Sequence, residues 1–163
     1  GVFTRDDAKD FLKFMESKDE DLRWRAWHNA KELIEGGVLT PEEVKERKRY
    51  LFELLESSDK SVREWAWGSV DELVKVGVLT LEEAKERKRY FFELLESKDE
   101  DLRWRAWRDV GELVEVGVFT RDDAKDFLKF MESNYENVRE KAKEFIRRLI
   151  KRGVLTRVDL FGL

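Results

Sequence analysis

The residues of this sequence best suited to chemistry are aromatic and cationic side chains that alternate in three segments. The chain has six tryptophans, and arginines stand beside or between them. An indole ring stacks on planar or cationic groups, and a guanidinium pairs with carboxylates and phosphates, so this mixture is typical of a binding surface. The residues that we expect to form such a surface are Trp24, Trp65, Trp104, Arg25, Arg105 and Arg108.

The residue types on which most enzymes depend are scarce. The chain has no cysteine and one histidine, His28, so the common nucleophile–base pairs and zinc sites cannot be built. The acidic pairs Asp6-Asp7 and Asp122-Asp123 lack the spacing of a calcium loop, and no glycine-rich phosphate loop occurs. We therefore predict that the protein is not an enzyme and that it uses neither a cofactor nor a metal.

A segment that recurs along the chain predicts the architecture. The string Gly-Val-Leu/Phe-Thr opens at Gly1, Gly37, Gly77 and Gly117 and begins again at Gly153. Each opening leads into two helix-like runs separated by a serine-containing break. A two-helix repeat of this length predicts an all-α fold, a right-handed α-solenoid of four helical hairpins. Within one repeat domain spanning 1–163, we expect units at 1–36, 37–76, 77–116 and 117–152, with 153–163 as a partial fifth unit or a C-terminal cap.

The units are unusually alike. Residues 1–17 are identical to 117–133, and residues 18–27 are identical to 98–107. Recent duplication, deliberate construction or a piece of a longer array would each produce this identity. Glutamine and cysteine are absent while lysine, glutamate and arginine dominate, which is the usage of hyperthermophile proteins and also of designed repeats.

The third unit shows how one repeat is expected to fold. Thr80 and Glu83 form a Thr-x-x-Glu capping box that starts a first helix over 81–96. Ser97 and Glu100 predict a second capping box at the start of the second helix. That helix carries an apolar stripe with the spacing of one helical face, which favours a buried contact with its neighbours.

Glycine is expected to end each second helix, in the left-handed conformation that suits a residue without a side chain. Within these helices, tryptophans at two kinds of position should differ in exposure. Trp27, Trp67 and Trp107 directly follow the central alanine of the stripe and border it. The three candidate site tryptophans lie further round the helix. We therefore predict that the first set is the more buried.

The second helices share a pattern that resembles a known repeat family. Asp-x-x-Leu/Val-Arg-x-x-Ala occurs in register at Asp19, Asp59 and Asp99, while the fourth unit has Tyr135 in place of the aspartate. This pattern is similar to that of HEAT-like repeats of the phycobilisome-lyase type. The resemblance implies that the alanine permits close helix packing and that each aspartate pairs with the arginine of the following unit. The Gly-Val-Leu-Thr opening and the tryptophans depart from the common repeat.

The overall charge is modest. The chain of 163 residues is 43% charged, yet its net charge is only −4, and no apolar run is long enough to cross a bilayer. We expect a cytoplasmic protein with no membrane partner. The basic clusters of the longer first helices, which include Arg47 and Arg87, should face outward as an ion-paired surface.

The function that this sequence favours is a non-catalytic binding or scaffolding module. Its concave surface of second helices would receive a macromolecular partner, which we expect to be a protein. Two alternatives remain: a nucleic-acid-binding protein with an Arg/Trp groove, which the acidic starts of the second helices make the weaker one, and a designed or structural repeat without a ligand. Apolar residues near both ends also predict end-to-end self-association.

Overall fold

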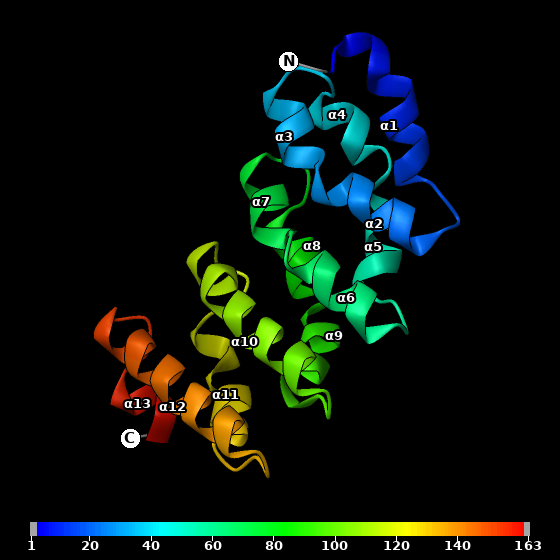
Figure 1. Cartoon of the computed structure of the whole chain (residues 1–163). Helices are drawn as coiled ribbons and strands as arrows, with labels where there is room; N and C mark the ends of the chain where they lie inside the picture. Colours follow the sequence, from blue (N-terminus) through cyan, green and yellow to red (C-terminus); the bar gives the residue numbers. More distant parts are fainter. Residues whose placement is uncertain (1–2, 162–163) are drawn as a thin grey trace. The chain divides into compact units, whose positions relative to one another are not determined.

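The computed structural model describes residues 3–161 of the chain, and its regular structure over this range is entirely helical, without a strand (Figure 1). The all-α prediction is therefore confirmed. The chain forms two compact units, one extending to Phe91 and the other beginning at Phe92. The division falls inside helix α9 (Lys88–Phe92), and each unit is described by itself.

The first unit consists of short helices that pair in sequence order. Helix α1 packs against α2, α5 packs against α6, and α2 also contacts both α5 and α6. The second helices of these pairs are each interrupted, after His28 and after Trp67. The elements of this unit are η1 (Arg5–Asp7), α1 (Ala8–Met15), α2 (Glu20–His28), α3 (Ala30–Glu35), α4 (Pro41–Lys45), α5 (Lys48–Leu55), α6 (Lys60–Trp67), α7 (Val70–Lys75) and α8 (Leu81–Lys85), followed by α9 up to the division.

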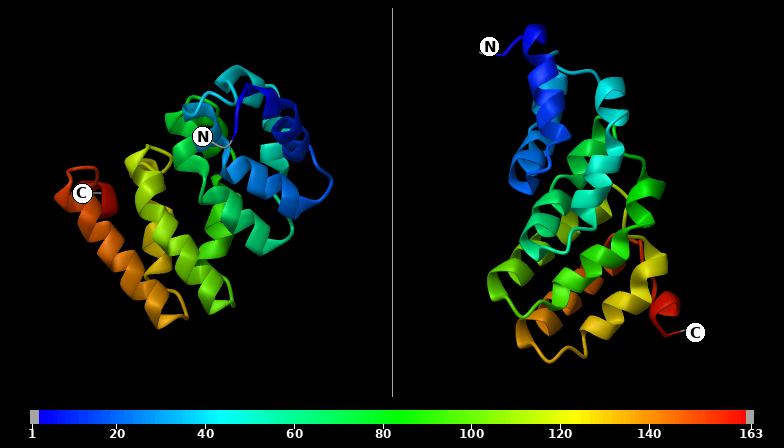
Figure 2. Two further views of the ribbon diagram at one scale, coloured as in Figure 1. Left: turned by 45° about the horizontal axis from the view of Figure 1, so that its top comes forward. Right: turned by 90° about the vertical axis from the view of Figure 1, so that its right-hand side faces the viewer.

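The second unit contains two long helices, α10 and α12, which lie side by side (Figure 2). The 3-10 segment η2 packs against α10, α11 packs against α12, and α13 packs against α11. The elements of this unit, after the end of α9, are η2 (Glu93–Glu96), α10 (Glu100–Glu115), η3 (Arg121–Asp123), α11 (Ala124–Phe130), α12 (Glu136–Lys151) and α13 (Arg157–Phe161).

The first helices begin as the sequence predicts. Thr40 and Thr80 accept a hydrogen bond from the backbone N–H of the residue three positions on, and the glutamate there accepts one from the backbone N–H of the threonine. Thr4 and Thr120 form the same box with an aspartate. These boxes satisfy backbone donors that the first turn of a helix leaves free.

The second helices begin differently from the prediction. Their N-caps are Asp19, Asp59 and Asp99, whose carboxylates accept hydrogen bonds from backbone N–H groups of the first turn. The serines expected to be N-caps lie two residues earlier, and the Oγ of Ser97, for example, accepts from the N–H of Asp99 at 3.3 Å. The predicted Ser-x-x-Glu boxes are therefore wrong, because the aspartate lies where a carboxylate reaches the free amides.

Glycine ends the second helices as predicted. Gly37, Gly77, Gly117 and Gly153 have φ angles of 76°, 81°, 94° and 74°, where a Cβ would be strained. At the first of them, the N–H of Val38 donates to the carbonyl of Leu33 at 2.9 Å, which is the hydrogen bond of a Schellman motif. Val38 is buried, so the residue after the glycine anchors the turn to the core.

The longer first helices are divided, so the prediction of one continuous helix over 81–96 is wrong. A break at Glu46 and Arg47 separates α4 from α5, and an equivalent break separates α8 from α9. The N–H of Arg47 turns to the carbonyl of Val44, and the Arg47 guanidinium donates instead to the carbonyl of Glu43 at 2.7 Å. The side chain thus replaces the backbone donor that the break removes.

Arg87 repeats this arrangement and is also packed against an aromatic ring. Its guanidinium donates to the carbonyl of Glu83 at 2.9 Å and lies 3.6 Å from the centre of the Phe52 ring. Arg47 and Arg87 are both half-buried. These arginines are therefore less exposed than the predicted outward face, but they are ion-paired as predicted: Arg47 Nε lies 3.1 Å from a carboxylate oxygen of Glu16, and Arg87 Nε lies 3.9 Å from one of Glu56.

Tryptophan anchors the two helices of a hairpin in three of the four repeats. The indole N–H groups of Trp27, Trp67 and Trp107 donate to the backbone carbonyls of residues 15, 55 and 95, at 3.2, 3.0 and 2.9 Å. These three rings are buried, whereas Trp24 and Trp65 are half-buried and Trp104 is exposed. The predicted order of tryptophan burial is confirmed.

Arginines of the second helices hold the loop between the two helices of a hairpin. Arg23, Arg103 and Arg139 donate from Nη1 to the carbonyls of residues 17, 97 and 133 at 2.9, 2.6 and 2.7 Å. Within residues 3–161, Arg139 makes no ion pair with Asp99, although the repeat resemblance implies one. Each of these two residues is instead satisfied by backbone atoms of its own hairpin.

Candidate functional site

The most distinctive surface of the second unit is a groove between α10 and α12. It encloses about 240 Å³. Both helices contribute residues at the spacing of one helical face. The lining residues are Trp104, Trp107, Arg108 and Gly111 from α10, and Lys141, Glu144, Phe145 and Arg148 from α12.

The floor of the groove is apolar and its rim is charged. Trp107 and Phe145 are buried, which fixes the two helices against each other. Gly111 lies in the interior of α10, where glycine costs about 1 kcal/mol relative to alanine. A Cβ at this position would meet no atom within 4 Å, so the glycine leaves open space in the groove.

Trp104 is the most exposed large aromatic residue of this surface, with 55% of its area accessible. The Arg108 guanidinium lies 5.4 Å from the centre of the Trp104 ring, within the range of a cation–π contact. The same guanidinium lies 4.0 Å from a carboxylate oxygen of Asp109. One side of the groove is therefore an exposed indole with a guanidinium held against it.

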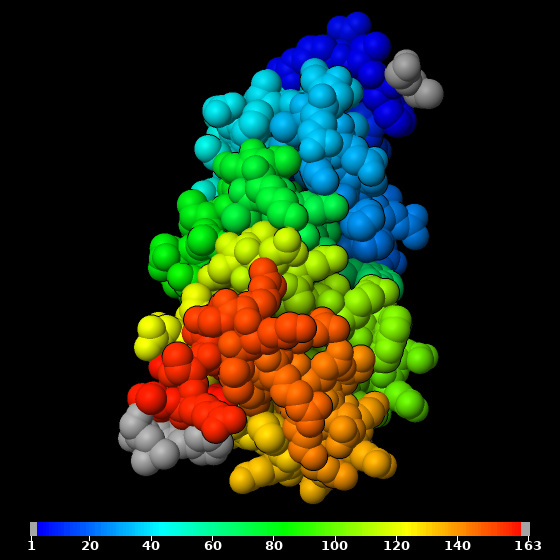
Figure 3. All heavy atoms as spheres, turned by 90° about the vertical axis from the view of Figure 1, so that its left-hand side faces the viewer, coloured from blue at the N-terminus to red at the C-terminus, as the bar shows by residue number. Residues whose placement is uncertain are grey.

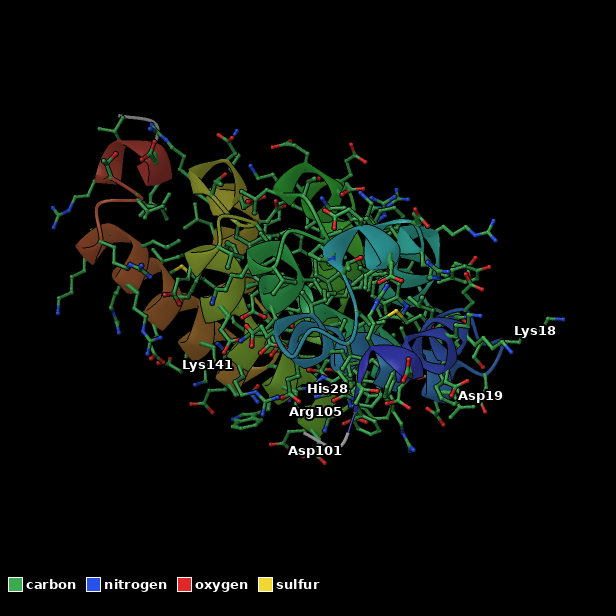
Figure 4. The ribbon with its side chains drawn as sticks, turned by 90° about the horizontal axis from the view of Figure 1, so that it is seen from above. Lys18, Asp19, His28, Asp101, Arg105 and Lys141 are labelled. Carbon is green, nitrogen blue, oxygen red and sulfur yellow. The ribbon has the colours of Figure 1, made fainter. Side chains whose placement is uncertain are left out.

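The opposite side carries two cations that share one carboxylate. Glu144 accepts from Arg148 at 2.8 Å and lies 3.9 Å from the ammonium of Lys141. The groove therefore has more positive than negative groups, and a further anion could be shared between Arg108 and the α12 cations. Figure 4 shows Lys141 on the same side of the molecule as Asp101 and Arg105 of α10.

The first unit contains a separate aromatic cluster. The rings of Trp24 and Trp65 lie 4.8 Å apart, and the His28 ring stacks on Trp24 at 5.2 Å. His28 Nδ1 is 3.3 Å from Ser69 Oγ. The Trp24 indole N–H is buried and has no acceptor within residues 3–161. This cluster joins α2 to α6. Because its two tryptophan rings pack against each other and are half-buried, they offer little surface to a partner.

The six residues predicted to bind are therefore divided. Trp104 and Arg108 lie together in the groove of the second unit. Trp24 and Trp65 pack against each other with tilted rings in the first unit, and the exposed Arg25 lines a separate small cavity. Arg105 is half-buried and does not line the groove.

The groove residues on α12 were missed by the sequence prediction. Lys141, Glu144 and Arg148 belong to a helix whose basic residues suggest a favourable interaction with the helix dipole and a polar outer face for a terminal repeat. Their spacing of three and four residues matches that of Trp104, Arg108 and Gly111 on α10. This shared spacing was the available signal, but only tertiary packing places the two faces opposite each other.

Two chemical possibilities can be checked over the described part of the chain. No group of three or more histidine, cysteine, aspartate or glutamate side chains among residues 3–161 is arranged to hold a metal ion. In the same range, no helix is long and apolar enough to cross a membrane.

Comparison with known proteins does not indicate what this groove binds. The chain matches no known protein family, and a search of curated proteins finds no match. The groove itself is thus the basis for a functional assignment.

Proposed function

We propose that the protein is a non-catalytic binding module, a right-handed solenoid of four HEAT-like hairpins that presents its second helices to an acidic segment of another protein. The repeated capping boxes, glycine C-caps and tryptophan anchors support a single hairpin design used along the chain. The expected localisation is the cytoplasm.

The observation that carries this proposal is the exposed Trp104 ring beside the Arg108 guanidinium in a groove rich in cations. Tryptophan and arginine are the residues most often found at the centre of protein interfaces. A large exposed indole on α10 also loses little conformational entropy when a partner covers it.

A carboxylate suits this groove better than a chain of phosphates. Glu144 lies between Lys141 and Arg148 and already neutralises part of their charge. A continuous phosphate backbone would bring several negative charges near that glutamate. A single acidic side chain could instead pair with Arg108 while an adjacent apolar side chain covers Trp104.

Nucleic acid is the second candidate, because the same groove combines an exposed indole with cations. Bases could stack on Trp104 and phosphates could pair with Arg108 and Arg148. Such binding must weaken steeply with salt, since it releases counterions from each neutralised phosphate.

Fluorescence anisotropy with two labelled probes tests the proposal. One probe is a peptide of alternating glutamate and leucine, and the other is single-stranded oligothymidylate, each titrated over a salt series. We expect the peptide to bind and the oligonucleotide not to bind. Arg108→Gln and Trp104→Ala should each weaken peptide binding by about tenfold or more.

Arg152→Gln is the matched control, because Arg152 is an exposed arginine at the C-cap of α12 outside the groove. It should leave peptide affinity unchanged. Stronger binding of the oligonucleotide, with a steep salt dependence, would replace the protein partner by nucleic acid. Binding of neither probe would favour a structural repeat without a ligand.

A further inference from the structure

The first hairpin exposes an apolar face that is buried in the other hairpins. Phe14 and Leu22 are 46% and 44% exposed and line a cavity of about 140 Å³ with Phe11. The residues equivalent to Leu22 in the other second helices are Val62, Leu102 and Val138, and they are 3%, 2% and 0% exposed. The position is thus one that a neighbouring hairpin ordinarily covers.

The second unit shows what covers this face, because residues 117–133 have the same sequence as residues 1–17. Phe127 and Phe130, the counterparts of Phe11 and Phe14, are buried. The Phe130 ring centre lies 6.0 Å from that of Phe92 and 5.5 Å from that of Trp107, both in the preceding hairpin. The 17-residue sequence can therefore dock on the outer face of a hairpin.

The fourth hairpin has an apolar face, next to α13, on which such a segment could dock. Helices α11, α12 and α13 surround an apolar cavity of about 540 Å³ whose lining residues are Leu128, Met131, Lys143, Ile146, Arg147, Ile150, Arg157 and Leu160. Figure 3 shows the side chains of α12 and α13 next to each other on this face. Leu128 and Lys143 occupy the positions that Phe92 and Trp107 hold in the preceding hairpin.

Helix α13 occupies part of the same site and resembles the start of the first hairpin. Thr156-Arg157-Val158-Asp159 matches Thr4-Arg5-Asp6-Asp7 in its threonine, arginine and terminal aspartate. Asp159 accepts from Arg121 at 2.9 Å, as Glu43 accepts from Arg5 at 2.9 Å in the first unit. The cavity beside this short helix has a volume of about 540 Å³, so α13 covers the face only in part.

We propose that two copies of the chain associate head to tail: the first hairpin of one copy displaces α13 of the other and inserts Phe11 and Phe14 into the apolar cavity. Asp7 of the second copy then takes the place of Asp159 opposite Arg121. Helix α13 acts as a removable cap over the site.

Charge complementarity supports this alignment of the two copies. In the first unit, the ammonium of Lys31 lies 3.9 Å from a carboxylate oxygen of Glu72 in the next hairpin. The equivalent residues across the proposed interface are Arg147 of one copy and Glu32 of the other, again a cation and an acid. Both are exposed.

Sedimentation equilibrium of the full chain, from about 1 µM to about 1 mM, tests the association. We expect a concentration-dependent dimer or larger species. Phe14→Glu should raise the dissociation constant by at least about tenfold, because it places a carboxylate in the apolar cavity. Asp159→Ala should lower it by about fivefold, because α13 loses the carboxylate that accepts from the N–H of its N-cap Thr156 and that pairs with Arg121.

Ser58→Glu is the matched control, because it adds the same charge at an exposed loop position that lines neither cavity. Exchanging two charges tests whether the copies are aligned as proposed. Arg147→Glu and Glu32→Arg should each weaken association severalfold, and the double variant should restore it. A strict monomer for both the wild type and Asp159→Ala would overturn the proposal. So would an unchanged dimer in Phe14→Glu, or a double variant that associates no better than the single ones.

Discussion

The identical segments at 1–17 and 117–133 allow a test of how much stability comes from tertiary context alone. Phe11 and Phe127 occupy the same position in the same local sequence. The Phe127 ring is fully buried, with ring centres of Phe145 at 4.4 Å and Phe119 at 5.6 Å. Phe11 is half-buried, and its ring contacts Phe3 at 5.0 Å between centres. Truncation to alanine should therefore have unequal costs.

The expected costs follow from burial. Phe127→Ala removes a fully enclosed ring and leaves a cavity, which costs roughly 3–5 kcal/mol. Phe11→Ala removes a ring that is partly in water in the folded state, so its cost should be roughly 1–2 kcal/mol. For a chain of this size, a loss of 1 kcal/mol lowers the melting temperature by about 2–4 °C. The two variants should thus differ clearly.

Thermal unfolding followed by circular dichroism at low micromolar protein measures both changes. At this low concentration the protein stays monomeric, so self-association does not add to the measured cost of Phe11→Ala. If the two units unfold in separate transitions, Phe127→Ala should shift the transition of the second unit and Phe11→Ala that of the first. Equal shifts for the two variants would refute the reasoning, because local sequence alone would then set the cost.

Three further predictions concern the capping boxes, the divided helices and the groove. The hydrogen bond from Arg5, together with that from the backbone of Thr40, lowers the pKa of Glu43 to about 2. The ionised Glu43 therefore contributes its full stabilisation above about pH 4.5, and this contribution is lost as the pH falls toward 2. Glu43→Gln should flatten the pH dependence of the free energy of urea unfolding between these values. Arg87→Ala should cost about 1–3 kcal/mol in urea unfolding, because it leaves the Glu83 carbonyl without its donor. Gly111→Ala should raise stability by about 0.5–1 kcal/mol, because the helix interior favours alanine and the added methyl group meets open space.

Neighbouring side chains serve as controls for the first two of these variants. Glu42→Gln and Lys85→Ala should change stability by no more than about 0.5 kcal/mol, since the Glu42 side chain is exposed and Lys85 makes only a surface ion pair with Glu82, at 3.7 Å. An acid dependence that persists in Glu43→Gln, or an Arg87→Ala variant as stable as Lys85→Ala, would contradict the roles assigned to these side chains. A destabilised Gly111→Ala would show that the groove floor is not open.

The sequence alone determined the helical class and much of the local structure. Threonine followed three residues later by an acid starts the first helices, and Gly77 with its successors ends the second ones, because these features depend on neighbours within a few residues. The order of tryptophan burial also follows from the helical period, which places Trp107 at the edge of the apolar stripe and Trp104 beyond it.

Tertiary structure decided the features that depend on distant partners. The breaks near Arg47 and Arg87 are stabilised by guanidinium groups that replace backbone donors, and local propensity does not reveal them. The groove joins α10 to α12, so Arg148 could not be assigned to it from its own helix. Phe14 and Phe130 have the same local sequence but differ in exposure, because burial is set by what packs against a side chain and not by the residues beside it.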